Sequence, residues 1–158
     1  MTMASGRADQ TEQADDAVVV EVVYPHPIQR VWRALTDPEA LGMWLMANDF
    51  APRVGHRFTF RTAPEQEWNG TVECEVAQVE EPTVLAYTWR GGGLPTTLVT
   101  YTLTPVAGGT RLRLVHSGFA AGGPAALRVR DLLGQGWNSK VLRTKLPALL
   151  ERLAAEEE

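Results

Sequence analysis

One histidine lies where a side chain could do chemistry inside an apolar interior. His116 alternates with Leu112 and Leu114 in a stretch of period two, so the three side chains share one face of the expected strand. An imidazole on a buried face could orient a ligand or transfer a proton. The alternative, which we favour, is a histidine that hydrogen-bonds a neighbouring backbone carbonyl at the strand end. We therefore assign no catalytic residue, and His116 is the single candidate.

The other polar residues form no recognisable metal or nucleophile motif. His26 and His56 lie in separate segments, and no spacing of His, Cys, Asp or Glu matches a metal site. Cys74 alternates with valines, which predicts an inert buried thiol. Ser117 lacks the Gly-X-Ser-X-Gly context of a nucleophile elbow, and Gly91–Gly93 lacks the lysine of a phosphate loop. We expect neither a structural metal nor a cofactor.

Aromatic residues are numerous enough to line a ligand cavity. The chain has five tryptophans, three tyrosines and four phenylalanines. Small-molecule sites are mostly apolar and aromatic with a few polar groups, although any single aromatic is more often plain core. Alternation alone does not tell which face of a sheet is concave. The candidate ligand-binding residues are Trp44, Phe58, Phe60, Tyr87, Trp89, Tyr101, His116, Phe119, Trp137 and Val141.

The composition indicates one cytoplasmic domain. A chain of 158 residues is long enough to bury a core of its own. The formal charge of −4, with both signs interspersed, gives no basic face for nucleic acid. A lone cysteine suits a reducing compartment, and residues 1–16 contain no apolar run for a signal peptide or membrane anchor. We expect residues 1–16 to form a disordered tail and residues 17–158 to fold.

The elements that would position these side chains begin with a strand and two short helices. The valine-rich stretch 17–24 favours a strand because β-branched residues fit the pleated sheet. A helix is predicted over 28–35, after Pro27. A second helix follows, with Asp37 as its cap and Pro38 in its first position.

The middle of the chain alternates with period two, which predicts consecutive antiparallel strands. A slip of the alternation at 77–79 suggests a bulge. Glycine pairs such as Gly108 and Gly109 fall where hairpins need tight turns. The five strands of this region are expected over 56–61, 67–79, 84–90, 97–104 and 110–116.

Residues 124–154 are predicted to form one long, bent helix in the hollow of the sheet. With 3.6 residues per turn, one apolar stripe contains Trp137 and Val141, and a nearly opposite stripe contains Leu142 and Leu146. A helix that is apolar on two sides should be buried rather than lie on a surface. We expect a bend at Pro147, which lacks an amide donor. The alternative is two surface helices that meet near residue 145.

Charged side chains are expected on the opposite, convex face of the sheet. Pairs between neighbouring strands would each contribute about 0–1 kcal/mol. Their ordinary role is solubility, and a docking face for a protein partner is the alternative. The residues are Arg57, Arg61, Glu73, Glu75, Arg111 and Arg113.

The order of elements and six local strings resemble the START-like (SRPBCC) superfamily, and within it the activator of heat-shock chaperone ATPase-like family. The strings are VWRALTDPEALGMW, RVGHRFTF, WNGTVECEV, LAYTWR, GGTRLRLVHSGF and GW. The resemblance implies an α+β helix-grip fold. In this fold a six-stranded curved antiparallel sheet holds a long C-terminal helix in its concave face. It also implies that residues 17–158 form a START-like ligand-binding domain with a cavity between helix and sheet.

Three functions are consistent with this resemblance. The leading hypothesis is binding or sequestration of a hydrophobic small molecule, such as a lipid, a polyketide or a related natural product. One use of such sequestration would be self-protection of a producing cell. Phe119 and its flanking glycines would act as a lid. A second hypothesis is a polyketide cyclase or dehydratase that uses His116, Tyr87 and Tyr101. A third is a co-chaperone-type domain with a protein partner. A binding role is favoured over an enzyme, and the state is expected to be monomer or homodimer.

Overall fold

The computed structural model describes residues 17–63, 70–91 and 95–157. The expected tail (1–16), the first residues of the second predicted hairpin strand (67–69) and most of the triple glycine lie outside these ranges. The elements are β1 (Ala17–Tyr24), α2 (Ile28–Thr36), α3 (Pro38–Trp44), β2 (Ala47–Asn48), β3 (Arg57–Arg61), β4 (Thr71–Glu80), β5 (Val84–Trp89), β6 (Thr97–Val106), β7 (Gly109–Ser117), η1 (Phe119–Gly122), α4 (Gly123–Gln135), η2 (Gly136–Lys145) and α5 (Leu146–Glu157).

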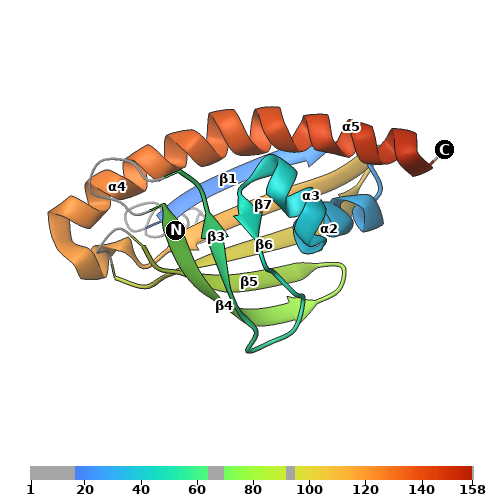
Figure 1. Ribbon diagram of the computed structural model, residues 1–158. Helices are drawn as coiled ribbons and strands as arrows, with labels where there is room; N and C mark the ends of the chain where they lie inside the picture. Colours follow the sequence, from blue (N-terminus) through green and yellow to red (C-terminus); the bar gives the residue numbers. More distant parts are fainter. Residues whose placement is uncertain (1–16, 64–69, 92–94, 158) are drawn as a thin grey trace, which may run out of the picture.

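The strands form one antiparallel sheet in the order β1-β7-β6-β5-β4-β3-β2. This is the α+β helix-grip fold, with a curled sheet and a long C-terminal helix that runs along it (Figure 1). The sheet has seven strands rather than the six expected. The additional strand, β2, pairs only Ala47 and Asn48 with the end of β3, and two residues are too few to produce a period-two signal.

The two short helices begin and end near the residues that the sequence predicts. Asp37 is the N-cap of α3, and its carboxylate accepts a hydrogen bond from the Ala40 amide at 3.1 Å. α3 carries Trp44 into the core, where its indole Nε1 donates to the Ala34 carbonyl oxygen of α2 at 2.8 Å. The two helices are therefore locked together, and they close one end of the sheet's concave face (Figure 1).

Strand alternation separates a dry face from a charged face. On β5 the residues Leu85, Tyr87 and Trp89 are buried, and β6 and β7 continue the same face. The predicted bulge is present, because the β4–β5 register shifts between Val76 and Gln78. The dry face is the one that meets the long helix, through contacts of Trp137 with Trp89 and Tyr101. The alternation alone did not show which face of the sheet is concave, and these contacts identify it.

The long helix is continuous, but the expected arrangement of its apolar residues is wrong. Its central segment, η2, is a π-helix, in which the backbone bonds span five residues, and the Leu146 amide donates to the Val141 carbonyl oxygen. A five-residue step in a π-helix turns through a smaller angle than in an α-helix, and Trp137 and Leu142 are both buried in the same core. The change of helix type, from α to π and back to α, occurs before Pro147 rather than at it. Because the three segments follow one another without a break, the alternative of two separate surface helices is excluded.

Tyr24 ties the π-helical segment to the sheet. Its hydroxyl donates to the Leu142 carbonyl oxygen at 2.6 Å, in a buried position. A π-helix displaces carbonyl groups from the α-helical pattern, and this hydroxyl satisfies one of them. Burial raises the pKa of Tyr24 above its usual range, so the hydroxyl remains a donor at neutral pH.

We expect Tyr24→Phe to lower the free energy of unfolding by about 1–3 kcal/mol, because the Leu142 carbonyl then has no donor. Urea unfolding followed by circular dichroism measures the change. Val23→Thr is the matched control, since Val23 is the adjacent residue and 54 % exposed, and it should shift stability by less than about 0.5 kcal/mol. Equal stability of Tyr24→Phe and the unsubstituted protein would show that the carbonyl needs no protein donor.

Candidate ligand site between the sheet and the long helix

The structure brings the predicted site residues together on the concave side. Nine of the ten are buried and belong to one continuous core, whereas Val141 is half-buried at its margin. Trp137 links the helix to the sheet, with ring-centroid distances of 5.8 Å to Trp89 and 6.4 Å to Tyr101. Phe119 lies over His116, with centroids 4.7 Å apart. The residues thus share one interior rather than separate patches.

A second group of rings lies at the β3–β4 side of the same interior. Phe58 contacts Phe60 and Tyr87, each at a centroid distance of 5.3 Å. Phe50, which sequence reasoning missed, packs edge-on against Phe58 at 5.1 Å and is 3 % exposed. Phe50 lies in the connection between β2 and β3, so no alternation could have marked it as buried.

His116 is the centre of a buried hydrogen-bond chain. The Trp137 indole nitrogen, which can only donate, donates to His116 Nδ1 at 3.2 Å. The hydrogen of the neutral ring must therefore be on Nε2, which donates to Thr97 Oγ1 at 2.7 Å. Thr97 in turn donates to the Trp89 carbonyl oxygen at 3.0 Å. The chain joins the long helix to three strands, and both ring nitrogens of His116 are used.

This environment keeps His116 neutral. Burial lowers its pKa from 6.5 to about 3, because a charged ring would lose its hydration. We predicted that His116 is hydrogen-bonded at the end of its strand rather than free to react, and it is hydrogen-bonded. Its partners, however, are the side chains of Thr97 and Trp137 rather than a backbone carbonyl. In this arrangement His116 positions Trp137 and has no ring nitrogen available to transfer a proton.

Tyr87 and Tyr101 form the other polar pair of the interior. Their hydroxyl oxygens are 2.6 Å apart, and both residues are fully buried. Burial raises the pKa of both phenols above the usual range, so both stay protonated. Two hydroxyl hydrogens are present and only one can lie between the oxygens. No other acceptor for the pair occurs among the described residues.

The nine buried site residues belong to the core cluster in the region where the cavity is expected. None of the nine buried site residues has more than 8 % of its surface exposed, so water does not reach them appreciably. A guest in this interior would have to displace side chains of the site itself.

A groove of about 700 Å³ follows the seam where the long helix meets the edge strand β1. Gly134 of α4 faces Val18 across it, and a Cβ at Gly134 would be 3.5 Å from a Val18 methyl group. Arg143 crosses the seam to donate to the Glu21 carbonyl oxygen at 3.1 Å. The groove is lined by Ala17, Val18, Val19, Val20, Glu21, Arg130, Asp131, Gly134, Gln135, Asn138 and Arg143.

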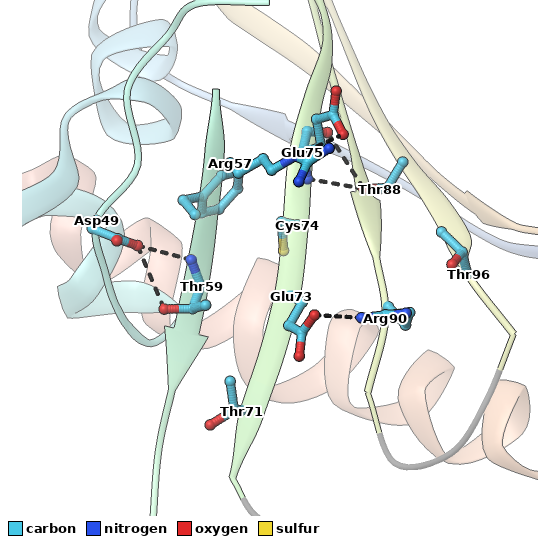
Figure 2. A pocket seen from close by; sticks show the side chains of 11 residues that line it. Asp49, Arg57, Thr59, Thr71, Glu73, Cys74, Glu75, Thr88, Arg90 and Thr96 are labelled. Atoms are coloured by element: carbon cyan, nitrogen blue, oxygen red, sulfur yellow. Dashed lines mark hydrogen bonds and ion pairs between the residues drawn. The ribbon is translucent and has the colours of Figure 1, made fainter. Parts of the chain in front are cut away.

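A second groove, of about 590 Å³, lies on the charged face of the sheet (Figure 2). Its charges are paired with one another: Arg57 lies 3.6 Å from Glu75, and Arg90 bonds Glu73. The Asp49 carboxylate accepts from the Thr59 amide at 2.8 Å. Exposed pairs of this kind suit a solvated surface, and a docking role for this face remains a prediction.

No group of three or more His, Cys, Asp or Glu side chains suited to a metal ion occurs in the part of the chain that the structure describes. Within the same ranges, none of the helices combines the length and apolar character needed to span a bilayer.

Comparisons with known proteins agree with this fold. The sequence matches the family described as Activator of Hsp90 ATPase homolog 1-like protein over residues 25–151. No curated protein matches it. Protein MLL2253 from Mesorhizobium loti is 38% identical, with 90% of this chain and 98% of that chain covered and a TM-score of 0.70.

Two further solved structures are informative. BH1534 from Bacillus halodurans is 30% identical, with coverages of 85% and 96% and a TM-score of 0.69. DynU16, a protein of the dynemicin biosynthetic locus, is 25% identical over 91% of this chain and 49% of its own, with a TM-score of 0.67. Fold, family match and relatives agree that the chain belongs to the Activator of Hsp90 ATPase homolog 1-like family of the START-like superfamily.

Proposed function

We propose that the protein binds a hydrophobic small molecule between its sheet and its long helix. The observation that carries this proposal is the incomplete seam between α4 and β1, which runs beside a buried interior of aromatic rings. An apolar guest that enters there replaces ring-to-ring contacts with contacts of the same kind, so little free energy is lost in the exchange.

The two halves of the long helix are attached unequally, which supports entry under α4. The 12 residues of α5 bury four leucines, whereas the 13 residues of α4 bury only Ala126. Leu127 and Leu133 add half-buried contacts. Segments with few buried apolar contacts open most easily, so α4 acts as the cover and α5 as the anchor.

The relative from the dynemicin biosynthetic locus supports a natural product as the guest. A polyketide or related molecule held in this way would be sequestered from the rest of the cell, and self-protection of a producing cell is one such use. The lone cysteine supports a cytoplasmic location for this role.

An enzyme acting on the same guest is the second candidate, and the tyrosine pair favours it, since a hydroxyl can polarise a ketone. Binding is the better supported function because His116, the other polar group of the interior, has both nitrogens engaged.

A reversible lock across the seam tests the proposal. The double variant Val18→Cys/Gly134→Cys places two thiols where the groove is narrow, and Cys74 is buried away from it. We expect the reduced protein to take up the neutral fluorescent probe N-phenyl-1-naphthylamine and the oxidised protein to take it up more slowly. Reduction with dithiothreitol should restore the rate, so each sample is its own control.

The outcomes separate the binding site from its entrance. Equal uptake before and after oxidation would refute entry under α4. If neither form binds the probe, and native mass spectrometry of the unsubstituted protein finds no co-purified lipophile, then the binding function is wrong.

A further inference from the structure

The tyrosine pair is a hydrogen-bond donor that the protein itself leaves unused. Tyr87 on β5 and Tyr101 on β6 are diagonal neighbours on one face of the sheet, because Tyr101 pairs with Leu85, two residues before Tyr87. Once one hydroxyl donates to the other, the second hydroxyl hydrogen has no acceptor among the described residues. Buried hydroxyls almost always have a partner, because a donor removed from water without one costs free energy. An unpaired donor in this interior therefore points to a group that is bound from outside.

The surroundings restrict the chemistry of that group. The rings that surround the pair are all apolar or aromatic, and they belong to Phe50, Phe58, Phe60, Trp44 and Trp137. The buried polar residues of the described chain are His26, Thr97, Thr110 and His116, so no buried lysine or arginine could neutralise an anion. A charged acceptor such as a carboxylate would lose its hydration without compensation. A neutral carbonyl oxygen fits both the donor and the apolar surroundings.

Tyr101 is the member of the pair that faces the helix. Its ring is 6.4 Å from Trp137 of η2, whereas Tyr87 contacts the rings of β3. Trp137 lies at the start of η2, directly after the end of α4. If it is displaced when α4 opens, the space it leaves adjoins Tyr101. Tyr87 then donates to Tyr101, and Tyr101 donates to the guest. Successive hydrogen bonds of this type polarise one another.

We propose that the Tyr87–Tyr101 pair recognises a ketone or quinone oxygen on the buried end of an apolar guest. This inference rests on the proposed function and adds the chemical class of the ligand. It predicts that the protein distinguishes two molecules of the same shape by a single carbonyl group.

Fluorenone and fluorene test this directly, because they share one ring skeleton and differ at one carbon. In the unsubstituted protein, fluorenone should bind about 2- to 10-fold more tightly than fluorene, which is the range of one net hydrogen bond. Tyr101→Phe should remove this preference, and Tyr87→Phe should weaken it. Calorimetric titration gives the two affinities, and the fluorenone carbonyl stretch should shift to lower frequency only when Tyr101 is present.

Tyr24→Phe is the control variant, because it removes a buried hydroxyl whose hydrogen is already used by Leu142. Its fluorenone preference should be unchanged. Equal affinities for fluorenone and fluorene in the unsubstituted protein would overturn the carbonyl inference and leave hydrophobic binding intact. A preference that survives Tyr87→Phe/Tyr101→Phe would overturn the inference as well. Failure of both molecules to bind would count against the proposed function itself.

Discussion

The protein should lose stability steeply as the pH falls below 6.5, and His116→Gln should remove much of this loss. The reason is the neutral state of His116. Its pKa is about 3 in the folded protein and 6.5 when exposed, so between these values the unfolded chain binds a proton that the folded chain excludes. By linkage, the free energy of unfolding then decreases as the pH decreases.

The effect is large because the two pKa values are far apart. The stability from this residue is complete above pH 6.5 and falls by about 1.4 kcal/mol per pH unit, or about 3 kcal/mol by pH 4. Thr97, Trp89, Trp137 and Phe119 surround the ring. None of these is a carboxylate that could stabilise the imidazolium ion.

Glutamine is the appropriate replacement because its amide can keep both hydrogen bonds. The oxygen can accept from Trp137, the nitrogen can donate to Thr97, and neither titrates. Urea unfolding at a series of pH values should give a shallower slope for the variant than for the unsubstituted protein. Parallel slopes would mean that the carboxylates elsewhere cause all of the acid sensitivity and that His116 is not held neutral by burial.

Much of the fold follows from local patterns in the sequence. The strands occur close to their predicted ranges because each has one dry face, and a one-sided alternation fixes both period and extent. Asp37 caps α3 as predicted because an N-cap depends only on residues within one turn. β2 was missed because its two residues pair through the backbone and carry no pattern of their own.

The long helix shows where such patterns fail. A period of 3.6 residues places Trp137 and Leu142 on different sides of the helix, yet in the π-helical segment both are buried in one core. The contacts that favour this step are tertiary, such as the bond from Tyr24 to Leu142, whose residues are 118 positions apart. No window along the sequence contains both partners.

The polar groups of the candidate site were only partly predictable for the same reason. Tyr87, Tyr101 and His116 could be assigned to strand faces, and all three lie on the concave face. Their partners depend on register and on the position of the helix. The tyrosine pair and the chain from Trp137 to Thr97 therefore became apparent only in three dimensions.

The unequal attachment of the long helix should appear as unequal costs of truncating its leucines. We expect Leu150→Ala in α5 to lower the free energy of unfolding by about 2–5 kcal/mol, because the side chain is fully buried against the core. Arg30 of α2 also bonds Glu157 at the end of α5, at 2.8 Å and 3.0 Å. We therefore expect this half of the helix to leave the sheet only when the whole domain unfolds.

Leu133→Ala in α4 is the matched variant, since it makes the same chemical change in the other half of the helix. Leu133 is only half-buried, so its loss should cost less than about 1.5 kcal/mol. Hydrogen exchange should agree, with amides of α4 exchanging through local opening while those of α5 exchange through global unfolding. If the two variants cost the same and both segments exchange together, α4 is held as firmly as α5. In that case the helix has no part that could lift to admit a guest.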